Sequence, residues 1–319
     1  MLFSLLKIPA RFALKIYCRS LQINRPNMLK MKGPLLIAAN HPNSFLDAII
    51  LATLFDQPIY SLARGDAFAG GFISKLLYGM NILPVYRISE GAHNLNHNYD
   101  TFSKCREIFK KGGIVLIFSE GLCVNEWKLR ALKKGTARLT MESWAEGIDL
   151  KILPAGINYH SFVSFGKHIH LNFGNIITKE QMGEPDNNGL FIKSFNEQLK
   201  MELLPLIDHF DENNKAAIRQ KYVKPVGNSQ MVLLAFPAML GKWLHAPLYL
   251  PVKSISLKKA APFSHHDSVV VGLLCLLYPL YLSVIAGLVY IGTGGWYWLL
   301  PFLLLPLTAW AFVQTKKVD

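Results

Sequence analysis

Cysteine is scarce in this sequence, and its few copies are widely separated. Only four occur, with no CxxC pair and no histidine at metal-ligand spacing beside them, at Cys18, Cys105, Cys123 and Cys275. This pattern excludes a disulfide framework and a zinc site and favours a reducing, cytoplasmic setting. The chain also contains no GxSxG, no P-loop and no GxGxxG motif. Their absence counts against a serine hydrolase, a nucleoside triphosphatase and a dinucleotide-dependent enzyme.

Charged side chains are few, and acidic ones are the fewest. They make up 17% of the 319 residues, and 34 Lys and Arg outnumber 21 Asp and Glu, which gives a net charge of +13. Since hydrophobic residues reach 51% and the mean hydropathy is +0.24, the composition excludes disordered and fibrous classes. An apolar chain with a basic excess favours an anionic membrane surface over nucleic acid as its partner.

A long stretch without charge lies near the C-terminus, between residues 268 and 315. It is too long for one membrane span and suits two, about 268–291 and 296–314, with three glycines at the turn. Lysines precede the first expected span and follow the second, at Lys253, Lys258, Lys259, Lys316 and Lys317. The positive-inside rule therefore predicts a transmembrane hairpin with both ends in the cytoplasm. A buried helix pair of a soluble protein is the alternative.

Two further segments are expected at the membrane. Residues 230–251 are apolar but interrupted by Lys242, His245 and prolines, which predicts an interfacial segment within a membrane-associated region 226–319. Residues 1–29 start with an apolar stretch in which cations recur every four positions, at Lys7, Arg11, Lys15 and Arg19. That spacing predicts an amphipathic helix on anionic lipid, with the solvated face of an ordinary packed helix as the alternative.

Between these ends, residues 30–225 alternate short apolar runs with helical patterns. Strands are expected at 35–40, 82–87, 114–121 and 150–158, and helices near 44–55, 94–110 and 133–146. Buried strands that alternate with helices predict an α/β domain with a mixed, largely parallel sheet flanked by helices.

Polar clusters follow the first three of these strands: His41 and Asp47, then Arg87, then residues 119–121. Reactive groups in such sheets collect at the carboxyl ends of strands. Asp47 could take the Nδ1–H of His41 and leave Nε2 free to accept a proton from a substrate hydroxyl. Alternatively, Ser44 and Asp47 form a capping box at a helix start, and His41 is an ordinary loop residue.

Other polar residues have two interpretations each. Arg87 suits bidentate phosphate binding or a salt bridge, and Glu120 could bind a substrate hydroxyl or end its strand. Gly121 permits backbone amides to approach a ligand. Arg130 begins either a phosphate-attracting segment or a solvated helix face. Beside the first expected span, an interfacial position is favoured over metal binding for His265, His266 and Asp267.

Four blocks, in this order, resemble the motifs of the glycerolipid acyltransferases, the family of bacterial lysophosphatidate and glycerol-phosphate acyltransferases. The histidine–aspartate block corresponds to NHPNSFLD at 40–47, and the arginine block to NILPVYR at 81–87. The FPEG block corresponds to FSEG at 118–121, and an apolar-proline block to LPAG at 153–156. The resemblance covers about residues 30–165.

The match departs from the family pattern in several places. Five residues instead of four separate His41 from Asp47, as in a branch that includes fungal glycerol-phosphate and dihydroxyacetone-phosphate acyltransferases. Asn81 stands where glycine is usual, and Ser119 replaces the proline of FPEG. The Thr-Arg that commonly follows FPEG is absent, which makes Arg130 the candidate for the missing cation.

The resemblance implies a membrane-bound O-acyltransferase that moves a fatty acyl group from an acyl thioester to lysophosphatidate, forming phosphatidate. His41 would be the general base, oriented by Asp47. Substrate-binding roles would fall to Arg87, Glu120, Gly121, Arg64, Arg130, Asn43, Ser119 and Pro154. The resemblance implies no metal and no bound cofactor, with acyl-CoA or acyl carrier protein as the donor. The catalytic domain would lie on the cytoplasmic face of the membrane.

Other functions stay open at this point. Within the family, the acceptor could be glycerol 3-phosphate, dihydroxyacetone phosphate or another lysolipid. From another class, the chain could be a non-catalytic membrane protein. A transporter would need ionisable residues inside its spans, and 268–315 contains no charged residue. A lipid hydrolase using the same histidine would lack a recognisable serine nucleophile.

Overall fold

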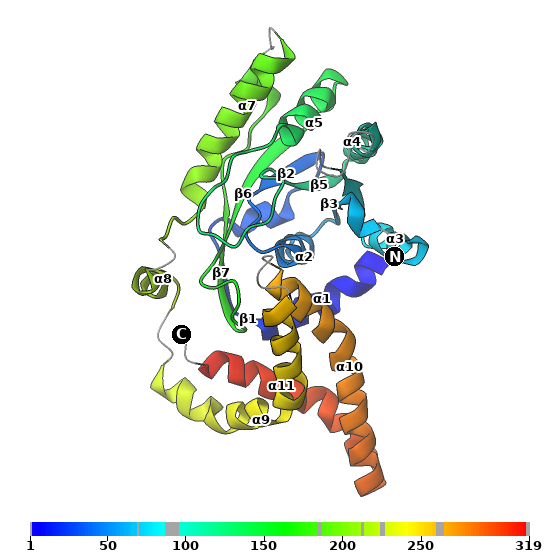
Figure 1. The fold of residues 1–319 in the computed structure, drawn as a ribbon, viewed down its shortest axis with the longest axis vertical. Coiled ribbons are helices and arrows are strands. Elements are labelled where there is room, and N and C mark those ends of the chain that lie inside the picture. The colour runs from blue at the N-terminus through cyan, green and yellow to red at the C-terminus, as the bar shows by residue number, and fades with distance from the viewer. Residues whose placement is uncertain are drawn as a thin grey trace.

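The computed structural model describes residues 2–68, 70–86, 96–183, 187–211, 214–223, 227–259 and 265–316. A sheet flanked by helices forms one end of the molecule, and long helices from the C-terminal region form the other (Figure 1). The first helix lies where these two parts meet, so elements from both ends of the chain surround the same region.

Within the described residues, the sheet has seven strands in the order β1-β7-β6-β2-β5-β3-β4. The strands are β1 (Cys18–Ile23), β2 (Leu35–Ala39), β3 (Ile59–Arg64), β4 (Ile82–Val85), β5 (Ile114–Phe118), β6 (Lys151–Tyr159) and β7 (Lys167–Phe173). Neighbours pair in parallel except β6 and β7, which are antiparallel. The predicted fold class, a mixed and largely parallel sheet with flanking helices, is confirmed.

Helices cover both faces of the sheet, as buried parallel strands require. The helical elements are α1 (Leu2–Tyr17), η1 (Pro26–Lys30), α2 (Phe45–Leu54), η2 (Gly65–Phe68), α3 (Gly71–Gly79), α4 (Asn96–Lys110), α5 (Lys134–Ala145), α6 (Lys179–Met182), α7 (Asn188–Leu203), η5 (Leu204–Leu206) and α8 (Lys215–Tyr222). Along the fully buried β2, Leu35, Ile37 and Ala39 face a core shared with α2. Leu36 and Ala38 face a second core shared with α4, α5 and α7.

The secondary structure expected for this domain forms close to its predicted limits. Strands β2, β4, β5 and β6 occupy the four expected runs, and α2 and α5 lie within one residue of their expected ends. The third expected helix begins at Asn96 in the described residues. Strands β1 and β3 extend the sheet beyond the sequence-based expectation.

Helix α1 turns apolar side chains outward. Its exposed residues include Leu5, Ile8 and Phe12. Lys7 and Arg11 instead donate hydrogen bonds to backbone carbonyls at the C-terminal end of α2. Cations there satisfy the last helical carbonyls and complement the helix dipole. A helix therefore forms where one was expected, but two of its three cations bind the protein, and Arg19 lies beyond it in β1 and donates to the carbonyl of Lys316. Its position on a lipid surface stays a prediction.

Three helices of the C-terminal region are long and apolar enough to cross a membrane. They are α9 (Asn228–Lys259), α10 (His266–Thr293) and a third formed by η7 (Trp296–Leu299) and α11 (Leu300–Thr315). The last two match the expected spans 268–291 and 296–314. The segment 230–251, expected at the interface, lies inside α9, which is one continuous helix of 32 residues.

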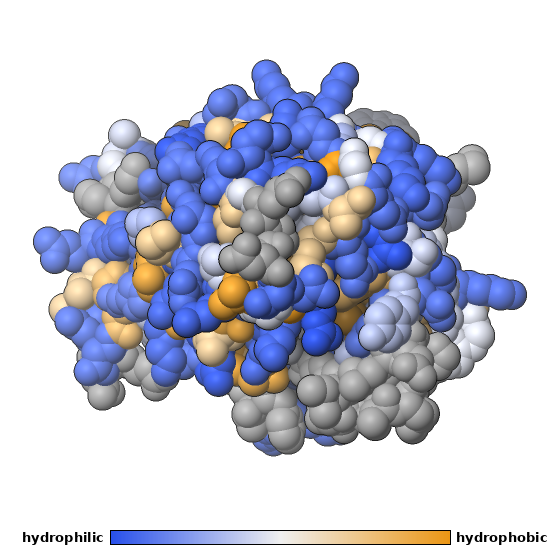
Figure 2. All heavy atoms as spheres, turned by 90° about the horizontal axis from the view of Figure 1, so that it is seen from above, coloured by the Kyte–Doolittle hydropathy of each residue, from blue (hydrophilic) through white to orange (hydrophobic). Residues whose placement is uncertain are grey.

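Polar and apolar surfaces separate along the molecule. Figure 2, viewed from above Figure 1, shows a mostly hydrophilic surface at the end far from α9–α11. Exposed large apolar side chains are frequent on α9–α11, for example Val232, Leu233, Trp243, Leu276 and Ile291. An apolar surface of this extent is unfavourable in water, which favours lipid around these helices.

We predict that Gly241→Ala loosens the packing of α9 on α11. A Cβ atom at Gly241 would lie 2.1 Å from the backbone oxygen of Thr308, so one helix must shift. Overpacking of this kind costs about 1–3 kcal/mol. Thermal unfolding in detergent should show a lower midpoint for this variant. Gly272→Ala is the matched control, because no atom lies within 4 Å of its Cβ position; equal midpoints for the two variants would contradict the prediction.

Candidate active site

His41 and Asp47 meet at the carboxyl end of the central strand β2. His41 lies just after the strand, and Asp47 lies in the first turn of α2. His41 Nδ1 is 2.9 Å from Asp47 Oδ2. The aspartate side chain is fully buried, whereas the histidine side chain is 17% exposed. Asp47 thus engages Nδ1, and Nε2 is the ring nitrogen left for a substrate.

Two further donors fix the Asp47 carboxylate. The backbone N–H of Asn43 donates to Oδ2 at 2.8 Å, and the Tyr159 hydroxyl donates to Oδ1 at 2.6 Å. Burial, together with the adjacent Asp47 charge, raises the pKa of Tyr159 well above its ordinary value, so this phenol stays protonated. Both oxygens of Asp47 therefore have partners, and the carboxylate has little freedom to rotate away from His41.

The loop between His41 and Asp47 is held in an unusual backbone conformation. Ser44 has φ 51° and ψ −131°, a region that residues with a Cβ atom rarely adopt. Asn40 fixes the start of the loop, because its side-chain amide bonds the backbone N–H and carbonyl of Ile157 in β6. The Ser44 side chain makes no helix-cap hydrogen bond. The capping box considered as an alternative therefore does not form.

Glu120 holds the same loop from the side of β5. Its buried carboxylate accepts hydrogen bonds from the backbone N–H of His41 at 2.9 Å and of Arg130 at 2.8 Å. Burial raises the pKa of Glu120 above its ordinary value, and these two hydrogen bonds oppose the shift. Phe118, which ends β5, stacks its ring on His41 with centroids 3.8 Å apart. Both the backbone and the ring of His41 are thus held in place.

The remaining residues of the FSEG and LPAG blocks shape the backbone around the pair. Ser119 is buried, and its hydroxyl accepts a hydrogen bond from Thr136 at 3.0 Å. Gly121 has φ 63°, a left-handed conformation that favours glycine. Pro154 lies in β6 opposite Ala38 of β2. These positions set the geometry of the loops that follow the strands.

Arg64 lies at the edge of this region. It ends β3, and its half-exposed guanidinium pairs with Asp66. The pKa of His265 is lowered by burial first, and then by the positive charges of Arg64 and His41.

The other two predicted arginines are Arg130 and Arg87. Arg130 contributes its backbone N–H to Glu120, and its guanidinium pairs with Glu126. The Arg130 side chain is 36% exposed, so an anionic ligand could reach it. Arg87 lies outside the described residues, and its predicted role stays a prediction.

Comparisons with known proteins agree with the sequence motifs. Residues 20–158 match the family model described as Acyltransferase. This stretch contains His41, Asp47 and Glu120 and runs from β1 into β6. This part of the chain, which carries the four motif blocks, is therefore similar to the acyltransferases.

Individual relatives are distant. The chloroplastic 1-acyl-sn-glycerol-3-phosphate acyltransferase LPAT1 of Arabidopsis thaliana is 23% identical over 150 residues, which are 47% of this chain and 39% of the plant protein. The chain therefore spans well under half the length of this relative. The crystal structure of the 1-acyl-sn-glycerophosphate acyltransferase PlsC from Thermotoga maritima is similar with a TM-score of 0.47 and 11% identity, over 70% of this chain and 81% of that one.

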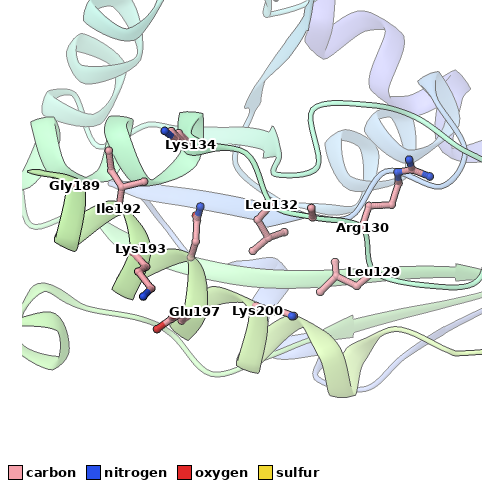
Figure 3. A pocket seen from close by; sticks show the side chains of 11 residues that line it. Leu129, Arg130, Leu132, Lys134, Gly189, Ile192, Lys193, Glu197 and Lys200 are labelled. Carbon is pink, nitrogen blue, oxygen red and sulfur yellow. The ribbon is translucent and has the colours of Figure 1, made fainter.

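A basic pocket opens next to Arg130. It has a volume of about 650 Å³ and lies between the loop 129–134 and α7 (Figure 3). Its charged lining residues are Arg130, Lys134, Lys193, Lys200 and Glu197. Four cations against one carboxylate favour an anionic ligand.

Sequence reasoning misses several residues of this candidate site. Tyr159 contacts Asp47, and the Cys123 sulfur accepts the backbone N–H of Ser44 at 3.0 Å. Asp267, at the start of α10, accepts a hydrogen bond from the Asn43 side chain at 2.5 Å. In the sequence, the only sign of a role for Asp267 is its charge directly before the uncharged stretch 268–315. Within the described residues, no three His, Cys, Asp or Glu side chains gather as a metal site would need.

We predict that Glu120→Gln destabilises the protein in a pH-dependent way. The amide leaves one of the backbone N–H groups of His41 and Arg130 without an acceptor, which costs about 1–3 kcal/mol. Because the pKa of Glu120 is raised above 4.5, the folded wild type binds more protons than the unfolded chain just above that pH, so its stability falls as the pH rises. The variant lacks this titration.

The stability difference between wild type and Glu120→Gln should therefore narrow as the pH rises above 4.5. Unfolding curves at a series of pH values measure it. Glu197→Gln, at an exposed carboxylate, serves as the control and should follow the wild type. Parallel pH profiles for wild type and Glu120→Gln would contradict the assignment.

Proposed function

We propose that this chain is a membrane-bound O-acyltransferase that transfers a fatty acyl group from an acyl thioester to lysophosphatidate, forming phosphatidate. One observation carries the proposal: His41 and Asp47, 2.9 Å apart, at the carboxyl end of the central strand of a domain that matches the acyltransferase family. In open α/β sheets, ligands bind at this edge.

The chemistry follows from the free nitrogen of His41. Its Nε2 takes the proton of the acceptor hydroxyl while the hydroxyl oxygen attacks the thioester carbonyl. Asp47 accepts the Nδ1–H and stabilises the imidazolium that forms. When the tetrahedral intermediate collapses, the carbon–sulfur bond breaks and the thiolate leaves with the proton from His41. General base catalysis of this kind contributes about 10²- to 10⁴-fold.

Lysophosphatidate is the acceptor that we favour. The plant relative is named for 1-acyl-sn-glycerol-3-phosphate, and the membrane helices suit a lipid acceptor. We assign the acceptor phosphate to Arg64 and Arg130, whose side chains are partly exposed. Arg87 joins them on the basis of the sequence motif. Glycerol 3-phosphate or dihydroxyacetone phosphate is the second candidate, because of the five-residue spacing in the histidine–aspartate block. Another lysolipid is a further alternative.

The membrane helices bring the acceptor to the site. The first turn of α10 contacts the loop after His41, so the end of a candidate membrane span lies beside the His41–Asp47 pair. Lysines at the ends of these helices favour the cytoplasmic side for the domain. A lysolipid could then reach His41 from the bilayer while a soluble donor arrives from the cytoplasm, as acyl-CoA or acyl carrier protein. Such positioning of two substrates supplies much of the rate.

We predict that His41→Ala abolishes acyl transfer without changing folding or membrane association. Detergent-solubilised protein is assayed with a long-chain acyl thioester, with lysophosphatidate, glycerol 3-phosphate and other lysolipids tested side by side. The loss should be about 10²-fold or more. His209→Ala, at an exposed histidine, is the matched control and should keep wild-type rates. A near-normal rate for His41→Ala would show that the mechanism is wrong.

The same assay tests the choice of class. Product from lysophosphatidate alone supports the favoured acceptor, and product from another acceptor replaces it. A folded wild-type protein without product from any acceptor would support the non-catalytic membrane protein instead.

We also propose that Lys193 and Lys200, on the side of the basic pocket formed by α7, bind phosphates of the acyl donor, and predict that Lys193→Ala with Lys200→Ala raises the KM for acyl-CoA. Exposed charge pairs contribute up to about 1 kcal/mol each, so an increase of about three- to tenfold is expected with kcat unchanged. The control removes two exposed lysines outside the pocket, by Lys179→Ala with Lys215→Ala. An increase confined to the lysophosphatidate KM would assign the pocket to the acceptor, and no change in either KM would contradict a substrate site.

A further inference from the structure

The first turn of α10 contacts the loop that joins His41 to Asp47. Three consecutive loop residues take part, through side chains and backbone. The contacts are Asn43 Nδ2 to Asp267 Oδ2 at 2.5 Å, Ser44 Oγ with His265 Nδ1 at 3.1 Å, and the Phe45 N–H to Ser268 Oγ at 3.1 Å. A helix more than 200 residues later in the chain therefore completes the surroundings of this loop.

Asp267 is fully buried among polar partners. Besides Asn43, it accepts from the Tyr17 hydroxyl at 2.5 Å, and it pairs with Lys167 Nζ at 2.8 Å. Lys167 is also fully buried, and its ammonium group donates to the carbonyl of Ser161. A buried ion pair gives little stability relative to apolar residues of the same shape, because both charges lose their hydration. Its presence here calls for another explanation.

Asn43 connects this ion pair to the His41–Asp47 pair. Its side chain donates to Asp267, while its backbone N–H donates to Asp47 Oδ2, the oxygen that also contacts His41. The next residue, Ser44, has the unfavourable backbone conformation described above. Such a conformation persists only where several contacts fix it, and the contacts from α10 fall on this residue and both its neighbours.

We propose that Asp267 and Ser268 are positioning residues that hold residues 43–45 in the geometry that the His41–Asp47 pair requires. Lys167 fixes the Asp267 carboxylate, and Asn43 transmits its position to Asp47. The start of a candidate membrane helix is thereby part of the active site rather than an anchor alone. The inference rests on the proposed acyl transfer.

The test compares two variants that differ in one hydrogen-bond acceptor. Lys167→Met with Asp267→Asn removes both charges and keeps an oxygen for Asn43. Lys167→Met with Asp267→Leu also removes both charges, keeps nearly the same shape and offers no acceptor. Tyr17→Phe is a third variant, because it removes a different hydrogen bond to the same carboxylate, one that does not reach the loop.

The Leu variant should have a kcat about ten- to a hundredfold below that of the Asn variant, with the donor KM within about twofold. Tyr17→Phe should lower the unfolding temperature while its kcat stays near wild type. A purely structural ion pair predicts equal kcat for the Asn and Leu variants once both are folded, and that result would overturn the inference. A folded wild-type protein with no transfer activity would instead refute the proposed function.

A milder pair of variants keeps the test decisive if the buried substitutions prevent folding. Ser268→Ala removes the acceptor of the Phe45 N–H, and its kcat should fall severalfold without a change in donor KM. Ser283→Ala lies on the same helix, where its hydroxyl bonds only the carbonyl of Pro279 among the described contacts, and should match the wild type. Equal kcat for Ser268→Ala and wild type would count against positioning by α10.

Discussion

The candidate active site depends on one buried group, the carboxylate of Asp47. Removing a carboxylate from water costs several kcal/mol unless hydrogen bonds compensate it. Here the donors are His41 Nδ1, the N–H of Asn43 and the Tyr159 hydroxyl, which lies at the end of β6. Because β6 pairs with β2 in parallel register, the phenol reaches the carboxylate only when these two central strands are correctly aligned. The sheet therefore controls the orientation of the histidine.

Two other buried carboxylates hold residues of the loop that precedes Asp47. Glu120 accepts the N–H of His41 from the side of β5, and Asp267 accepts the Asn43 amide from α10. Each one satisfies polar groups of a loop that would otherwise lose its hydrogen bonds to water. Since the two carboxylates bind different residues of this loop, neither replaces the other. The loop is held in place because Glu120 and Asp267 each bind one of its residues.

Local sequence patterns predict the helices and strands of this fold better than they predict the tertiary contacts between them. The apolar run of β2, the His41–Asp47 spacing and the uncharged stretch 268–315 are visible in the sequence because each depends on neighbouring residues. The edge strand β1, the antiparallel pairing of β7 and the role of Tyr159 depend on partners far away in the chain.

Asp267 shows most clearly what the sequence alone does not predict. The sequence predicts an interfacial position for Asp267, because it lies next to an uncharged span. In the structure its side chain is fully buried and contacts Lys167 and Asn43. No periodicity could reveal this, because the partners lie about 100 and more than 200 residues earlier. Arg87, in contrast, is prominent in the sequence and lies outside the described residues. Sequence motifs thus point to His41 and Asp47 as candidates, whereas the residues that contact this pair from far along the chain emerge only from the tertiary contacts.

Helix α2, which carries Asp47, is held at both ends by elements with exposed apolar surfaces. At its start, Ser268 of α10 accepts the Phe45 N–H, and at its end, Lys7 and Arg11 of α1 bind the last carbonyls. Lipid that orders α1 and α10 would therefore act on the same helix from two sides. Any other placement of α2 would break the hydrogen bonds at one of its ends, and α2 carries Asp47 to His41. The geometry of the His41–Asp47 pair and the positions of α1 and α10 therefore depend on the same contacts of α2.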